Sequence, residues 1–222
     1  MVNKTNLLIA WIVLSTIGLS LGQLGNYSFW TVFQLKGMAR GIELIRGLTI
    51  SGVIQSLPFA ILTAPLIHAV RLNFNRWILV NVVSMTLALI LPSILELIGN
   101  PANTFSMFYN ARRDGHILSW ILTYVSQAIF IARSKEQMII LGTINALAGI
   151  LHMVNTIILS FIVGFATDPT FFKNYNQPRV VTPLSELYTP IFIVFIILMI
   201  TVSLNAVVFS KAIDNNARKN SR

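Results

Sequence analysis

The amino-acid sequence predicts an all-α integral membrane protein, a bundle of about six transmembrane helices joined by short loops. Two features of the composition lead to this fold class. Hydrophobic residues make up 55% of the 222 residues and charged residues only 10%, whereas charged residues form about a quarter of an ordinary soluble domain. A soluble fold of this length cannot bury so much apolar surface, but the hydrocarbon interior of a bilayer accepts it.

Six stretches of the chain approach or reach the length that a membrane span needs. The hydrocarbon layer is about 30 Å thick, so a helix crosses it with roughly 20 mostly apolar residues. Residues 191–200 are apolar at every position, as in a lipid-facing helix, whereas a strand of a transmembrane barrel alternates apolar and polar residues. The predicted spans are 7–25, 47–70, 77–98, 117–132, 138–166 and 187–210, of which the fourth is the shortest.

The connections between the spans are short, which leaves no room for a separate soluble domain. The sequence therefore predicts a single membrane domain over residues 1–210 and a basic polar tail over residues 211–222. The beginning of the chain has two interpretations. Lys4, the apolar run after it and the small residues near Gly22 fit a cleaved signal peptide. An uncleaved first span is favoured, because a multi-pass protein needs no separate signal.

The net charge of +9 does not indicate a nucleic-acid partner, because the basic residues stand singly or in pairs beside the spans. Cations in these places contact lipid headgroups. With six spans, both termini lie on one side of the membrane, and the positive-inside rule predicts that this side is the cytoplasm. It carries nine of the sixteen lysines and arginines: Lys4, Arg71, Arg76, Arg133, Lys135, Lys211, Arg218, Lys219 and Arg222.

The fifth span places small and polar residues on one face of its helix, and Asn145 and His152 are two of the polar ones. One interpretation is a helix-packing seam, because small residues let two helices approach closely. The other is a functional site at His152, because ionisable residues inside a membrane mark proton relays and ligand sites. A hydrogen bond to Asn145 or Asn155 would satisfy the imidazole without any function. The seam consists of Gly142, Gly149, Thr156 and Ser160.

Two further titratable residues are candidate functional residues. Glu96 follows Pro92 by one helical turn in the third span, and proline removes a backbone donor and opens the helix. A carboxyl group there either binds a proton or cation, or lies in the headgroup layer at the end of the span. His68 stands near Pro65 in the second span, which also contains Pro58. Bent helices of this kind line the sites of many transporters.

The sequence contains no recognised catalytic or cofactor-binding motif. The zinc pattern HExxH, the phosphate loop GxxxxGK[ST] and the nucleophile elbow GxSxG are all missing. The chain has no cysteine, which excludes disulfides, thiol catalysis and Cys-ligated metals. His68, His116 and His152 stand far apart in the sequence. We therefore predict no metal site and no cofactor, and we do not favour an enzyme.

Short segments resemble two known families. Asn75-Arg76-Trp77 and Gly115-His116, at the starts of the third and fourth spans, resemble the six-helix DRAM-type membrane proteins, but the aromatic and acidic loop after the first helix is missing. Residues 25–31, 153–155 and 168–169 resemble, in order, the membrane A-subunit of the archaeal copper monooxygenases, with different spacing. Neither resemblance covers enough of the chain to carry over a site residue.

Three functions follow from these patterns. The favoured one is a non-catalytic membrane component, a subunit, scaffold or assembly partner whose contacts are the lipid bilayer and other membrane protein subunits. The second is a small secondary transporter or channel that uses His152 and Glu96. The third, which rests on the second resemblance, is a membrane subunit of a multi-subunit enzyme.

Overall fold

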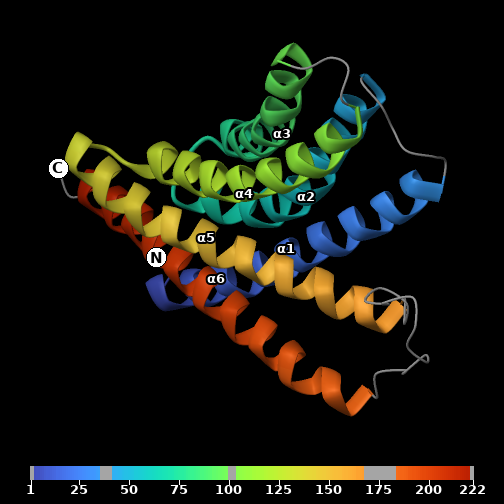
Figure 1. Ribbon diagram of the computed structural model, residues 1–222. Helices are drawn as coiled ribbons and strands as arrows, with labels where there is room; N and C mark the ends of the chain where they lie inside the picture. Colours follow the sequence, from blue (N-terminus) through green and yellow to red (C-terminus); the bar gives the residue numbers. More distant parts are fainter. Residues whose placement is uncertain (1–2, 36–41, 100–103, 168–183, 221–222) are drawn as a thin grey trace.

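The computed structural model describes residues 3–35, 42–99, 104–167 and 184–220, and their regular structure is entirely α-helical. No β-strand occurs in these ranges, which confirms the predicted all-α class. The bundle contains α1 (Lys4–Leu35), α2 (Ile42–Ala69), α3 (Phe74–Gly99), α4 (Thr104–Ile131), α5 (Lys135–Thr167) and α6 (Leu184–Asn220) (Figure 1).

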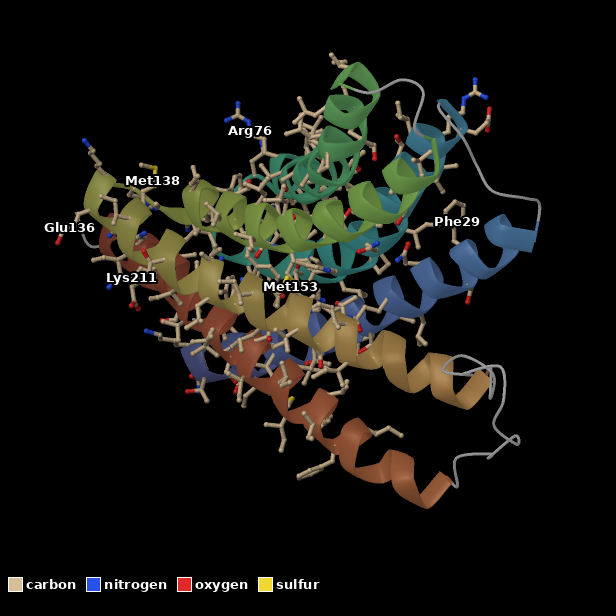
Figure 2. All side chains as sticks on the ribbon, viewed as in Figure 1. Phe29, Arg76, Glu136, Met138, Met153 and Lys211 are labelled. Carbon is tan, nitrogen blue, oxygen red and sulfur yellow. The ribbon has the colours of Figure 1, made fainter. Side chains whose placement is uncertain are left out.

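Each helix packs antiparallel to the next one along the chain, and α6 returns to pack on α1. Contacts between α1 and α2 run in reverse order, with Gly18 against Phe59 and Gly22 against Gln55. The first and last helices meet where Lys4 Nζ lies 2.6 Å from an oxygen of Asp214. We call this the terminal end of the bundle, and the opposite end the loop end. Figure 2 shows Glu136 and Lys211 at the terminal end.

Among the described residues, five helices are long and apolar enough to cross a membrane: α1, α2, α3, α5 and α6. The sixth helix, α4, does not meet this criterion, and it is longer than the span predicted at 117–132. The helix starts at Thr104, and its apolar part, Leu118–Ile131, is shorter than a usual span. Its first half contains Arg112, Arg113 and Asp114, so hydropathy marked only the second half of a longer helix.

The residues assigned to a polar tail from position 211 continue α6 as far as Asn220. Ala212 and Asn215 are buried there. Arg133 Nη1, just after α4, donates a hydrogen bond of 2.7 Å to the carbonyl oxygen of Asn215. The last turns of α6 therefore pack as part of the bundle, with neighbours on α1, on α5 and in the turn between α4 and α5.

Tight caps build the turns at the terminal end. Arg71, with φ of 56°, ends α2 in the left-handed conformation, and its N–H donates to the carbonyl oxygen of His68 at 2.8 Å. Asn73 caps α3 by accepting the N–H of Arg76 at 3.0 Å. Ser134 caps α5 by accepting the N–H of Gln137 at 3.1 Å. These caps bond the backbone groups that helix ends leave unpaired.

Aromatic rings fill the core near the terminal end. The indole of Trp11 stacks on Phe209, with ring centroids 4.0 Å apart and planes 11° apart. Trp77 and Phe59 pack against the same indole at 5.8 Å and 6.2 Å. Four helices, α1, α2, α3 and α6, therefore share one aromatic core, and two of its indoles also make the polar contacts described next.

Candidate functional site

Polar side chains from five helices meet around Asn205 of α6. Trp11 Nε1 donates to Asn205 Oδ1 at 3.1 Å. Asn205 Nδ2 donates to Gln127 Oε1 at 2.9 Å and to Asn145 Oδ1 at 3.2 Å. Gln127 Nε2 in turn donates to Asn81 Oδ1 at 2.7 Å. We call Trp11, Asn81, Gln127, Asn145 and Asn205 the carboxamide network.

Two further bonds extend the carboxamide network. Asn81 Nδ2 donates to the carbonyl oxygen of Trp77 at 2.9 Å. Trp77 Nε1 donates to Thr63 Oγ1 of α2 at 2.9 Å, so the bonded side chains include members from all six helices. None of these side chains carries a charge, and each is at most 3% exposed. Buried polar groups are tolerated when they are hydrogen-bonded, so this network holds the helices in register.

His152 of α5 lies further toward the loop end and bonds a different helix. Its Nε2 is 3.0 Å from Gln23 Nε2 of α1, and the same amide nitrogen donates to Thr156 Oγ1 at 3.0 Å. The Thr156 hydroxyl donates to the carbonyl oxygen of His152 at 2.9 Å, so it accepts from Gln23. An amide nitrogen only donates. His152 Nε2 therefore accepts, and the proton of the neutral ring lies on Nδ1.

Aromatic rings from α4 surround the imidazole. The Trp120 ring lies 3.9 Å from that of His152, and the Tyr124 ring lies 6.0 Å from it, measured between centroids. Asn155, one turn further along α5, is also fully buried. We call Gln23, Trp120, Tyr124, His152, Asn155 and Thr156 the histidine cluster.

Several buried atoms of the histidine cluster have no hydrogen-bond partner among the described residues. They are Trp120 Nε1, Tyr124 Oη, His152 Nδ1 and both amide atoms of Asn155. In the carboxamide network, by contrast, every buried side-chain amide makes hydrogen bonds. The two polar centres therefore differ in kind, since one is internally satisfied and the other is not.

The structure separates the members of the predicted packing seam. A Cβ atom added at Gly149 would lie 2.8 Å from Ile121 Cα and 3.0 Å from the carbonyl oxygen of Trp120, so α4 and α5 approach closely there. A Cβ atom at Gly142 would meet nothing within 4 Å, so no helix packs closely on that position. Thr156 belongs to the histidine cluster, and the side chain of Ser160 lies outside the described residues.

Of the other candidate residues, Asn145 and His68 make their contacts away from His152. Asn145 bonds Tyr124 and Asn205, so Gln23 and not Asn145 is the partner of His152. His68 is exposed at the terminal end and packs against Phe74, with ring centroids 6.1 Å apart. The side chains of Glu96 and His116 lie outside the described residues. α2 stays one helix through its two prolines.

The sequence predictions missed one readable signal, the pair Gly18 and Gly22. This GxxxG spacing is typical of closely packed transmembrane helices. A Cβ at Gly18 would lie 2.5 Å from Phe59 Cα, and one at Gly22 would lie 3.0 Å from the carbonyl carbon of Gln55. Asn81, Gln127 and Asn205 were missed as well, because one isolated amide per helix forms no pattern.

The described residues contain no group of three or more His, Cys, Asp or Glu side chains that could hold a metal ion. Comparison with protein-family models, with curated proteins and with solved structures finds no match for the chain. Any functional proposal must therefore rest on the geometry of the chain itself.

Proposed function

We propose that the chain is an integral membrane protein with six helices in the bilayer and both termini in the cytoplasm. Five apolar helices of spanning length support this proposal. The short apolar part of α4 lies in the same antiparallel bundle, packed against α3 and α5. Lys4, Arg71 and Arg133 at the terminal end supply the positive charge that favours the cytoplasmic side.

Within the membrane, we propose a non-catalytic component that binds another membrane protein through the loop-end half of α6. The observation that carries this proposal is the exposure of Ile191, Phe192, Ile193, Phe195 and Ile196, each between 41% and 62%. At about 100° per residue, these side chains cover more than half of the helix circumference. Over residues 191–196, more than half of the helix surface therefore faces away from the rest of the bundle.

The exposed residues of α1 are arranged differently from those of α6. Ile9, Val13, Ile17 and Leu21 are spaced by four and form a single stripe, as expected where one face of a helix meets lipid and the other meets protein. Figure 1 shows the loop-end half of α6 (orange) diverging from α1. A partner helix would cover one face of this half of α6, as the rest of the bundle covers one face of α1.

The chemistry of the segment defines the partner. Residues 191–200 are Ile, Phe, Val, Leu and Met, with no small residue. Helices in lipid approach closely where small residues occur at the contact. The partner is therefore a transmembrane helix that carries Gly, Ala or Ser on its contact face. The carboxamide network supports the same function, because a hydrogen-bonded, uncharged interior suits a scaffold that presents one helix.

The test places a photoreactive amino acid at Phe195 in the native membrane. The matched control position is Leu87 of α3, which is 55% exposed. We expect a discrete protein adduct from position 195, identified by mass spectrometry, and lipid adducts alone from position 87. The identified protein, reconstituted with the chain in nanodiscs, should bind at least ten times more weakly to the double variant Phe192→Ala, Phe195→Ala, whereas Leu87→Ala should leave its affinity unchanged.

Lipid adducts alone at both positions would mean that the exposed half of α6 simply faces the bilayer. An adduct between two copies of this chain would replace the proposed partner by a homo-oligomer. Either result overturns the proposal.

A further inference from the structure

The histidine cluster keeps unmatched polar atoms in a fully buried setting. Trp120, Tyr124, His152 and Asn155 are at most 2% exposed, and each carries at least one polar atom without a partner among the described residues. Such atoms are rare in folded proteins and cost stability when they are left unmatched. Five of them, on four residues in adjacent turns of two packed helices, indicate a ligand.

The unmatched atoms are mostly donors. The indole Nε1 of Trp120 only donates, and so does the amide nitrogen of Asn155. His152 Nδ1 carries the ring proton, because Nε2 accepts from Gln23. The Tyr124 hydroxyl adds a fourth donor, and the acceptors are that hydroxyl and the amide oxygen of Asn155. A ligand that matches this set carries accepting oxygens.

The surroundings of the histidine cluster select a neutral ligand. No Lys, Arg, Asp or Glu occurs among the buried residues that the structure describes, so a buried ion would lack a counter-charge, which is costly. The rings of Trp120 and Tyr124 lie beside the unmatched atoms, with centroids 6.3 Å apart. They form an apolar, planar wall that suits a ring-bearing molecule.

Gln23 of α1 covers one side of the histidine cluster. The α4–α5 contact is closed by the backbone approach at Gly149. Between α1 and α5, the half-buried side chain of Gln23 bonds His152 and Thr156. Gln23 and Thr156 are the half-buried members of the histidine cluster, whereas the others are buried, so the side of the cluster that they form lies nearest to the surface of the bundle.

We propose that the histidine cluster binds the carbonyl oxygen of a neutral, membrane-soluble molecule of the quinone class. Its carbonyl oxygen accepts from His152 Nδ1 and Asn155 Nδ2, and its ring packs on Trp120 and Tyr124. The ligand enters between α1 and α5 when the Gln23 side chain moves aside. This binding site is separate from the protein contact proposed for α6.

The test measures equilibrium binding of decylubiquinone to the full chain in nanodiscs, with empty nanodiscs as the baseline for partition into lipid. We expect saturable binding that Asn155→Leu and His152→Leu each weaken at least tenfold. Ser93→Ala removes another unmatched buried hydroxyl, on α3, and should leave the affinity unchanged. Asn155→Leu removes an amide without partners, so its melting temperature should equal or exceed that of the wild type.

A second arm compares the quinone with its reduced quinol. Because the cluster offers mainly donors, the quinone should bind at least tenfold more tightly than the quinol, whose hydroxyl oxygens are weaker acceptors and whose protons need acceptors of their own. Binding no stronger than to empty nanodiscs would overturn the proposal, as would equal affinity for quinone and quinol or unchanged binding by the Asn155→Leu variant. Phe195→Ala should not alter quinone binding, so failure of the α6 contact and failure of this site are distinguishable.

Discussion

Replacing Asn205 by leucine tests whether the carboxamide network stabilises the bundle. Leucine keeps the number of side-chain heavy atoms and the branch at Cγ, so the main loss is in hydrogen bonds. The change leaves Trp11 Nε1, Gln127 Oε1 and Asn145 Oδ1 without their present partner. Gln127 and Asn145 keep the bonds made by their amide nitrogens, so the damage is confined to the three atoms that face Asn205.

The expected loss follows from those three contacts. Side-chain hydrogen bonds between membrane helices average about 0.6 kcal/mol and reach about 1.7 kcal/mol. Asn205→Leu should therefore lower the free energy of unfolding by about 2 kcal/mol, with an upper limit of about 5 kcal/mol. The upper part of this range applies if the three atoms stay buried and unpaired, because an orphaned group loses its full solvation.

The assay is reversible unfolding in mixed micelles, followed by circular dichroism as the denaturing detergent is titrated. Val207→Ala is the control, because Val207 lies on the same helix and is 52% exposed. A change at such a surface position should cost within about 0.5 kcal/mol. A double-mutant cycle with Trp11→Phe isolates one bond, and its coupling energy should be about 0.6 kcal/mol or more. Equal stability of Asn205→Leu and Val207→Ala would refute the stabilising role of the network.

Three further predictions concern other parts of the bundle. Gly149→Ala should lower stability by about 1–3 kcal/mol, because its Cβ would press on the backbone of Ile121, whereas Gly142→Ala should be neutral in the same unfolding assay. Lys4→Cys combined with Asp214→Cys should cross-link with a short bifunctional reagent, since the native side chains meet at 2.6 Å and the chain has no cysteine of its own. The control pair, Lys4→Cys with Leu35→Cys, joins opposite ends of α1, about 45 Å apart, and should not cross-link. Finally, His152→Ala should cost about 1–3 kcal/mol by depriving Gln23 of one of its two acceptors, while His152→Gln, which can still accept, should retain most of the stability.

The number and type of helices were predictable from hydropathy, but the ends of the helices were not. Hydropathy detects the apolar part of a helix, whereas a helix ends where its backbone is capped. The first half of α4 is polar and α6 continues past Lys211, so both helices extend beyond their apolar parts. Asn73 and Ser134 do carry readable cap signals at the starts of α3 and α5.

The candidate site was predictable only in part. A lone histidine in an apolar span drew attention to position 152, but its partner Gln23 lies 129 residues earlier in the chain. Helix periodicity places residues on a face and does not say which other helix packs on that face. The same limit hid the carboxamide network. Gly18 and Gly22 form the exception, because their spacing alone indicates close packing.

The two polar centres should respond with opposite sign to the same kind of substitution. Asn205→Leu removes an amide whose three partners stay behind unpaired, so it should destabilise the bundle. Asn155→Leu removes an amide that has no described partner, so the bundle should lose nothing or gain stability. Both asparagines are at most 3% exposed and lie on neighbouring helices, so burial does not distinguish them. Unfolding of the two leucine variants side by side tests the assignment. If Asn155→Leu proved as damaging as Asn205→Leu, Asn155 would be a structural residue, and the histidine cluster would belong with the carboxamide network.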